Sequence, residues 1–199
     1  GFTEMLMASD DAVHPGVRAD HLATIKRNGE HLLSLINDVL DLSKIEAQRM
    51  EVERVDVNLS VVVADVERTM RSKAAHKRLS LSVVYEPGVP AAIKSDATRL
   101  KQILMNLIDN AIKFTARGGV ELRIGLENAP GPTSGQLIRI DVCDTGIGIS
   151  KDQLPRLFNA FQQADASTTR EFGGTGLGLR ISRQLARMLG GDIRVSSEL

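Results

Sequence analysis

A glycine-rich run leads directly into a predicted amphipathic helix near the end of the chain. Of all the sequence features, this one most limits the folds that the chain can adopt. The stretch FGGTGLGL (172–179) holds four glycines in eight positions and continues into RISRQLARML. Glycine lets the backbone approach a ligand closely, and a helix N-terminus offers unpaired N–H groups to an anion. The run is therefore either a mobile loop or the phosphate-facing edge of a nucleotide site.

Two familiar nucleotide-binding patterns do not occur. The run reads GxGxG rather than GxGxxG, and it follows a polar segment rather than a strand, which excludes the usual dinucleotide fold. No GxxxxGK[ST] sequence is present, so the chain has no P-loop. Residues 162–172 are rich in Ala, Ser and Thr and predict a lid that leads into the glycines. Arg170 within this lid is either a phosphate contact or a solvated charge.

The overall composition favours a globular protein without a nucleic-acid partner. The 199 residues are 42% hydrophobic, and 25 basic residues balance 25 acidic ones. Aromatic residues make up only 3%, with no Trp, which argues against stacking platforms for single strands. No apolar run approaches the ~20 residues of a transmembrane helix, so we expect no membrane contact here. The single cysteine, Cys143, cannot pair within the chain and favours a reducing, cytoplasmic setting.

Residues 20–50 predict one long helix with a wide apolar stripe. Asp20 is the expected N-cap. Apolar or small residues recur at alternating steps of three and four, and further leucines widen the stripe on both sides. The stripe comprises Leu22, Ile25, Gly29, Leu32, Leu33, Leu35, Ile36, Val39, Leu40 and Leu42.

The residues before this helix indicate a helical hairpin. GFTEMLMAS reads as the end of a first helix, and DDAVHPGV reads as a turn because of Pro15 and Gly16. A two-helix hairpin cannot bury so wide a stripe alone. We therefore expect residues 1–50 to form a homodimer, with packing against the rest of the chain as the alternative.

From residue 51 onward the pattern becomes mixed. Short β-branched runs predict strands at 79–85, 120–126, 137–143 and 192–197. Helical periodicity predicts helices at 59–76, 96–115 and 176–189, and an exposed hairpin loop is expected at 127–135. This order predicts an α+β sandwich in which helices cover one face of a mixed sheet.

The predicted helix 96–115 carries an unusual polar stripe. Asn106, Asn110 and Lys113 share one side of the helix at steps of four and three. Asparagine is unfavourable inside a helix because its amide competes with the backbone, so two of them one turn apart need a reason. A carboxamide oxygen can ligate Mg²⁺, and a lysine can meet phosphate. The alternative is a solvated helix face.

A second candidate group follows the predicted strand 137–143. Asp144 continues the alternation of that strand, so its carboxylate is expected on the core side, where it would need a donor. The donor would come either from the turn DTGIGI or from the amino group of a ligand. Gly146 and Gly148 would let a flat ligand lie against the backbone. The alternative is an Asp that only closes a tight turn.

Taken in order, these segments resemble the sensor histidine kinases. QILMNLIDNAIKFT, DTGIGI, LFNAFQQAD and FGGTGLGL are similar to that family's N, G1, F and G2 boxes. GEHLLSLINDVLDLSKIEA resembles the second helix of its dimerisation hairpin. The resemblance covers nearly the whole chain. It implies a Bergerat-type ATP-binding sandwich at 51–199 behind a hairpin at 1–50 that dimerises into a four-helix bundle.

The resemblance also implies the activity and the partners. A sensor histidine kinase transfers the γ-phosphoryl group of ATP to a histidine and from there to an aspartate of a response regulator. ATP and Mg²⁺ are the expected cofactors, and the expected partners are a second copy of the chain and a receiver domain. The expected location is cytoplasmic, with a membrane anchor elsewhere in a longer parent protein left open.

Roles for individual residues follow from the matched boxes. Asn110 would be the Mg²⁺ ligand, and Asn106 and Lys113 would act beside the phosphates as catalytic residues. Asp144 would accept from the adenine amino group, with Gly146 and Gly148 flanking the ring. Further nucleotide contacts are implied for Phe161, Arg170, Gly174, Thr175, Gly176, Leu177 and Gly178.

The chain departs from the family pattern at both ends. The family's phosphoacceptor lies in a His-Glu-x-x-x-Pro motif upstream of a sequence like GFTEML, and that motif does not occur here. None of the four histidines has this context: His14, His21, His31 and His76. We therefore expect a truncated first helix, a phosphoacceptor outside the chain and no self-phosphorylation. We also expect the C-terminal strand that usually follows GGDIRVSSEL to be missing.

Two other functions remain open from the sequence. One is an ATPase or ATP-driven clamp of the same superfamily, and the other is a non-catalytic ATP-sensing module. The related ATPases carry a Glu at the position of Asn106, where it activates water. An asparagine cannot take that proton, which favours a kinase over a hydrolase.

Overall fold

The computed structural model describes residues 15–128, 135–158 and 176–198. The chain divides into two compact units, residues 1–50 and residues 51–199.

The first unit contains one long helix, α2 (Pro15–Glu46). The helix begins before the expected position, so the prediction of Asp20 as its cap is wrong. The prediction of a turn at Pro15 and Gly16 is wrong too, because a proline is well tolerated in the first turn of a helix, where its missing N–H has no partner to lose. The preceding helix that the sequence predicts lies outside the described residues.

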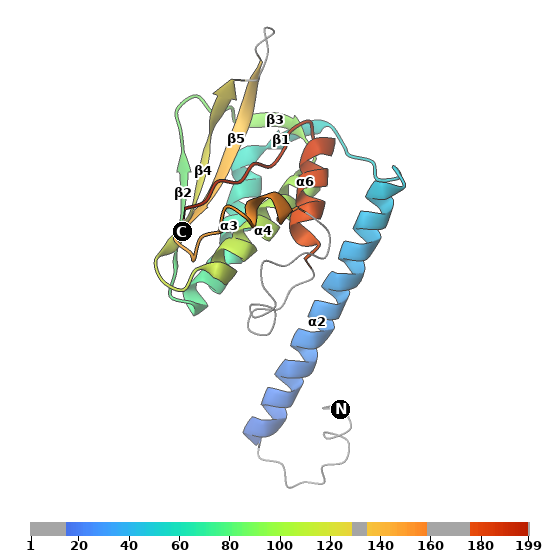
Figure 1. Cartoon of the computed structure of the whole chain (residues 1–199), viewed down its shortest axis with the longest axis vertical. Helices are drawn as coiled ribbons and strands as arrows, with labels where there is room; N and C mark the ends of the chain where they lie inside the picture. The colour runs from blue at the N-terminus through green and yellow to red at the C-terminus, as the bar shows by residue number, and fades with distance from the viewer. Residues whose placement is uncertain (1–14, 129–134, 159–175, 199) are drawn as a thin grey trace. The chain divides into compact units, whose positions relative to one another are not determined.

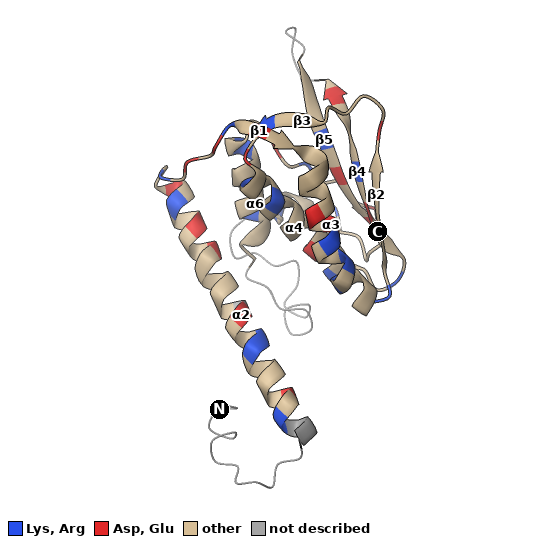
Figure 2. Cartoon of the chain, turned by 180° about the vertical axis from the view of Figure 1, so that it is seen from behind, with Lys and Arg blue, Asp and Glu red and all other residues tan. Residues whose placement is uncertain are grey.

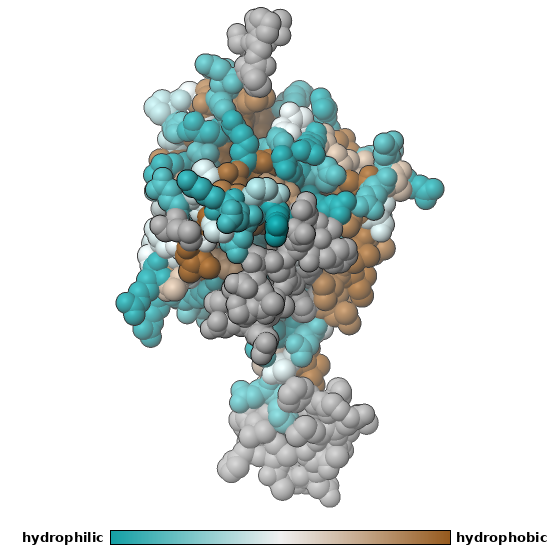
Figure 3. Space-filling view, viewed as in Figure 1, coloured by the Kyte–Doolittle hydropathy of each residue, from teal (hydrophilic) through white to brown (hydrophobic). Residues whose placement is uncertain are grey.

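The apolar stripe of α2 is largely exposed. Leu32 and Leu33 are 58% and 62% exposed. Between Glu30 and Asp38 the helix carries no charged residue, which leaves a long uncharged stretch in Figure 2. The hydrophobic side chains of α2 show as brown in the space-filling view (Figure 3). An exposed apolar face of this length is typical of a helix that packs against a partner.

The second unit alternates strands and helices in the order β1-α3-β2-β3-α4-β4-β5-η1-α6. The strands are β1 (Val55–Asn58), β2 (Ser80–Tyr85), β3 (Ala92–Ser95), β4 (Gly119–Asn128) and β5 (Gln136–Asp144). The helices are α3 (Leu59–His76), α4 (Ala97–Phe114), the short 3₁₀ helix η1 (Leu154–Arg156) and α6 (Gly178–Met188).

The strands that the structure describes form two sheets. β2 pairs in parallel with β4, and β4 pairs antiparallel with β5, so the main sheet is mixed, as the sequence predicts. The helices α3, α4 and α6 lie on one face of this sheet (Figure 1). β1 and β3 form a second, antiparallel pair that the sequence did not predict. The predicted α+β sandwich with one helical layer is confirmed.

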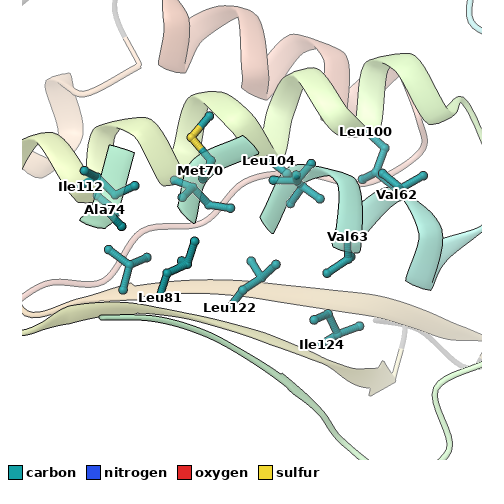
Figure 4. Close-up of a cluster of buried hydrophobic side chains, with 14 of the residues drawn as sticks. Val62, Val63, Met70, Ala74, Leu81, Leu100, Leu104, Ile112, Leu122 and Ile124 are labelled. Atoms are coloured by element: carbon teal, nitrogen blue, oxygen red, sulfur yellow. The ribbon is translucent and has the colours of Figure 1, made fainter. Parts of the chain in front are cut away.

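Two helices of this unit, α3 and α4, begin directly after a residue whose side chain caps them. The side chain of Asn58 accepts from the Val61 N–H at 3.3 Å and caps α3. Asp96 accepts from the Arg99 N–H at 3.0 Å and caps α4. Side chains of α3, α4, β2 and β4 then meet in one buried core, shown in Figure 4. The core fixes the buried face of α4 against the sheet. The polar residues Asn106 and Asn110 stand on the same helix outside this core.

The predicted strand 192–197 is not formed. Its residues carry no strand pairing in the structure, although their β-branched alternation favours one. The segment is held by side chains instead: Arg194 pairs with Glu127, and Ser197 Oγ accepts from the Ile149 N–H at 2.9 Å. A strand needs a backbone ladder, and the described contacts here are made by side-chain atoms.

Candidate functional site

The polar stripe of α4 meets the start of α6. Asn106 donates its Nδ2 to Ser182 Oγ at 2.8 Å, and Asn110 donates its Nδ2 to Asn106 Oδ1 at 3.4 Å. Both asparagines are half-buried, and Ser182 is buried. Asn106 therefore faces a neighbouring helix, and the solvated-face alternative does not hold for it.

Gly178 makes this contact possible. A Cβ built on Gly178 would lie 2.5 Å from Asn106 Oδ1 and 3.2 Å from its Nδ2. Any side chain at this position would push against the Asn106 amide. The last glycine of the run is thus required for the packing of α6 on α4, in addition to any role toward a ligand.

The N-terminus of α6 has no polar side chain at its N-cap position. The residue at the N-cap position is Leu177, which is buried and gives no side-chain hydrogen bond to the first turn. Gly176 before it has a φ of 69°, a conformation that glycine adopts easily. The N-cap residue thus supplies no side-chain cap here, and helix N-termini are sites where proteins commonly bind phosphate.

Asp144 stands at the end of β5, but it is exposed rather than buried. Asp144 lies directly opposite the buried Val120 of β4, so its side chain is on the core side of the sheet as expected, whereas the expected burial is wrong. Asp144 Oδ1 accepts from the Gly146 N–H at 2.8 Å, so the tight-turn hydrogen bond is present. In the part of the chain that the structure describes, its other oxygen, Oδ2, has no such partner.

The glycines after Asp144 let the backbone of this turn approach the end of α4 closely. A Cβ on Gly146 would lie 2.8 Å from the Phe114 carbonyl oxygen, which brings this turn against the end of α4. Gly148 has a φ of 70°. The turn therefore joins the end of β5 to the end of α4, the helix that carries the two asparagines.

Lys113 lies elsewhere on α4. It lines an open groove of about 490 Å³ on the α3 side of α4, together with Lys73, His76, Lys77 and Asp109. The pKa of Lys113 lies below its usual value, mainly because the side chain is partly buried. The nearby Asp109 carboxylate raises this pKa, and the Lys77 ammonium lowers it. The structure thus does not bring Lys113 into the Asn106–Ser182 contact, although its ammonium lies 4.9 Å from the centroid of the Phe114 ring.

Several predicted site residues cannot be placed. Phe161, Arg170, Gly174 and Thr175 lie outside the described residues. Ser182 is the residue that sequence reasoning missed. A serine inside an amphipathic helix carries no signal of its own, and only the approach of α4 reveals its contact.

Asn110 offers one side-chain oxygen of the kind that suits a nucleotide-bound Mg²⁺. Among the described residues no three His, Cys, Asp or Glu side chains gather as a metal site. Mg²⁺ held together with substrate phosphates needs only one or two protein oxygens. Because Asn110 Nδ2 is turned toward Asn106, its Oδ1 remains as the oxygen for a cation, so the donor set fits the ion.

Comparison with known proteins decides the family. Residues 95–199 match the family model described as histidine kinase-, DNA gyrase B- and HSP90-like ATPase. Residues 1–48 match the His Kinase A (phospho-acceptor) domain. The chain belongs to the sensor histidine kinase family. Within the described residues of this kinase chain, each helix is too short or too polar to cross a membrane.

Individual relatives agree with this assignment. The kinase chain is 44% identical over 199 residues to Sensor protein GacS of Pseudomonas syringae pv. syringae, covering 99% of the chain and 21% of GacS. It is 42% identical over 179 residues to Hybrid signal transduction histidine kinase B of Dictyostelium discoideum, covering 90% of the chain and 9% of that protein. The chain thus spans about a fifth or less of these relatives.

A solved structure gives the same fold. Full-length ShkA in complex with AMPPNP superposes with a TM-score of 0.71 at 33% identity, over 87% of this kinase chain and 34% of ShkA.

Proposed function

We propose that the chain is the ATP-binding catalytic core of a two-component sensor histidine kinase. It would transfer the γ-phosphoryl group of ATP to a histidine, from which a response regulator takes it onto an aspartate. The observation that carries this proposal is the meeting of α4 and α6: Asn106 packs against the first residue of α6, and Asn110 lies one turn further along α4 and donates to Asn106. Phosphate and Mg²⁺ are the ligands such an arrangement suits.

Each part of the site has a role in phosphoryl transfer. The first-turn N–H groups of α6 bind phosphate oxygens, and Asn110 would hold Mg²⁺, whose charge neutralises those oxygens. Lys113 adds a second positive charge once its side chain turns from the α3–α4 groove toward the phosphates. A histidine nitrogen then forms a bond to the γ-phosphorus, while the bond to the bridging oxygen breaks and ADP leaves with that electron pair. Positioning and charge supply most of the catalysis.

Asp144 would select adenine. Its Oδ1 is engaged by Gly146, so Oδ2 would accept the hydrogen bond from the adenine amino group. Guanine carries a carbonyl oxygen at that position and would place an acceptor against a carboxylate. We expect ATP to bind at least about tenfold more tightly than GTP, the usual consequence of leaving such groups unpaired.

Asn106 argues against the hydrolase alternative. Its amide donates to Ser182 and has no basic atom with which to take a proton from water. Hydrolysis should therefore be slow, which keeps the phosphoryl group for a histidine. A non-catalytic ATP-sensing module would share the binding site but would phosphorylate nothing.

The proposal includes two partners and a location. The exposed stripe of α2 would pair with the same stripe of a second copy. A receiver domain would take the phosphoryl group, and the catalytic core would lie in the cytoplasm, where ATP is supplied.

Isothermal titration calorimetry of the chain with ATP tests the proposed binding. ATP should bind in excess Mg²⁺ and more weakly in EDTA, and GTP should bind more weakly than ATP in both conditions. Equal binding of ATP and GTP would contradict the role of Asp144. Absence of ATP binding in Mg²⁺ would contradict the proposed function as a whole.

A further inference from the structure

We propose that Ser182 is a positioning residue that orients the magnesium ligand Asn110 through Asn106. This inference rests on the proposed function, since it concerns how the nucleotide's cation is bound. Ser182 itself touches neither nucleotide nor metal in this account. It acts by deciding which atom of each asparagine amide faces outward.

The first step is the contact between the two helices. Ser182 lies one helical turn after Gly178 in α6 and is 2% exposed. A serine inside a helix commonly donates its hydroxyl proton to the carbonyl one turn back, which leaves its oxygen as an acceptor. Ser182 Oγ accepts from Asn106 Nδ2 at 2.8 Å. This bond turns the nitrogen of the Asn106 amide toward α6.

The second step is the confinement of the Asn106 amide. A Cβ on Gly178 would lie 2.5 Å from Oδ1, 3.1 Å from Cγ and 3.2 Å from Nδ2 of Asn106. The whole amide group therefore packs against the glycine backbone. Between this backbone and the Ser182 hydroxyl the amide has one favoured orientation.

The third step passes that orientation along α4. Asn110 follows Asn106 by one turn, so the two side chains are neighbours on the helix surface. With its nitrogen on Ser182, Asn106 presents Oδ1 to Asn110 and accepts from Asn110 Nδ2 at 3.4 Å. The nitrogen of Asn110 is thus turned inward, and its oxygen remains for a cation.

The reverse arrangement would fail chemically. If the Asn106 amide were rotated by half a turn, its NH₂ group would face Asn110 and take the Asn110 oxygen as acceptor. Asn110 would then offer its own NH₂ group to Mg²⁺, which binds oxygen and not a protonated amide nitrogen. Ser182 therefore favours the one arrangement of the pair that can ligate the ion.

The test separates metal binding from nucleotide binding. AMPPNP affinity is measured by calorimetry in excess Mg²⁺ and in EDTA, and the ratio of the two dissociation constants reports the contribution of the metal. For Ser182→Ala we expect this ratio to fall roughly 3- to 10-fold, the effect of one hydrogen bond. The affinity in EDTA should change little. Ser182→Thr keeps the acceptor oxygen and should keep the wild-type ratio.

Ser43→Ala is the matched control. Ser43 lies in α2 and donates to the Val39 carbonyl at 2.8 Å, so the substitution removes the same group from an exposed helix in the other unit. A wild-type ratio in Ser182→Ala, or an equal loss of affinity with and without Mg²⁺, would overturn the inference, because a packing defect would weaken both. Wild-type chain that binds AMPPNP equally in Mg²⁺ and EDTA would contradict the role of Asn110 itself. Wild-type chain that binds no nucleotide would contradict the proposed function.

Discussion

Gly178 approaches Asn106 so closely that a Cβ on the glycine would stand 2.5 Å from the Asn106 Oδ1. Gly178→Ala should therefore displace the asparagine or push α6 away from α4. We expect a loss of stability of about 1–3 kcal/mol, as for other overpacked contacts, and at least tenfold weaker ATP binding. Denaturant unfolding and calorimetry measure the two effects.

The matched control for that substitution is Gly29→Ala in α2. A Cβ there meets nothing within 4 Å, and alanine favours a helix over glycine by about 0.8–1 kcal/mol. Gly29→Ala should leave ATP affinity unchanged. Normal ATP binding by Gly178→Ala would show that the close packing of Gly178 on Asn106 is not needed for the site.

Asp144→Asn should weaken ATP binding without disturbing its turn. Asparagine keeps an Oδ1 that can accept from the Gly146 N–H, so the turn hydrogen bond is retained. The second atom becomes an NH₂ donor that opposes the adenine amino group. We expect a cost of roughly 1.5–3 kcal/mol, or about 10- to 150-fold in affinity by calorimetry.

Asp56→Asn serves as the control for this change. Asp56 forms an exposed ion pair with Lys94 on the β1–β3 sheet, and its loss should leave the ATP affinity as it is. An unchanged affinity for Asp144→Asn would remove Asp144 from the adenine site.

Asp192→Asn should destabilise the second unit in a pH-dependent way. Hydrogen bonds from Arg183, at 2.8 and 3.2 Å, hold the pKa of the Asp192 carboxyl well below 3.8, with the Ile193 N–H and Arg187 adding to the effect. A lowered folded-state pKa gives stability that is present above pH 3.8 and is lost as the pH falls through the folded-state value.

At pH 7 this substitution should lower Tm by roughly 1–3 °C, since the ion pair is partly exposed. The difference from wild type should shrink as the pH is lowered below 3.8. Thermal unfolding followed by circular dichroism at several pH values measures it. A difference that stays constant across that range would mean that the carboxylate charge contributes nothing.

Leu32→Asp should break the proposed homodimer. Leu32 is 58% exposed on the uncharged stretch of α2, and a charge there would oppose burial against a second copy. Light scattering at high concentration should give a dimer for the wild type and a monomer for the variant. Val61→Asp, at a valine of α3 that is 62% exposed, should leave the dimer intact. A wild type that stays monomeric at all concentrations would contradict the proposal.

Local sequence signals predicted most of the second unit. The range predicted for α3 from helical periodicity matches the structure, and the α4 prediction at 96–115 extends one residue beyond each end of the helix, onto its caps Asp96 and Thr115. Local signals give a wrong prediction where one residue type is common in two kinds of structure. Pro15 favours a turn in the sequence, yet proline also suits the first turn of a helix, and the structure has it there.

Contacts between distant segments could not be predicted in the same way. β1 and β3 have four residues each, which is too short a stretch to show a clear alternation, and among the described strands they pair with one another. Residues 192–197 have the alternation of a strand but are held by side chains such as Arg194. The Asn106 stripe was visible in the sequence, whereas its partner Ser182 was not, because the approach of α6 to α4 depends on the whole fold.

Phosphoryl transfer from radiolabelled ATP tests the central proposal most directly. The chain holds four histidines, and none is followed by the Glu of the family's phosphoacceptor motif. Incubated alone with labelled ATP and Mg²⁺, the chain should carry no acid-labile label. Mixed with a separate helical hairpin that carries the His-Glu-x-x-x-Pro motif, it should label the hairpin, and Asn110→Ala should abolish that labelling. Acid-labile label on the chain alone, removed by His31→Ala, would show that the acceptor lies within the chain, and a hairpin that stays unlabelled while the chain binds ATP would contradict kinase activity.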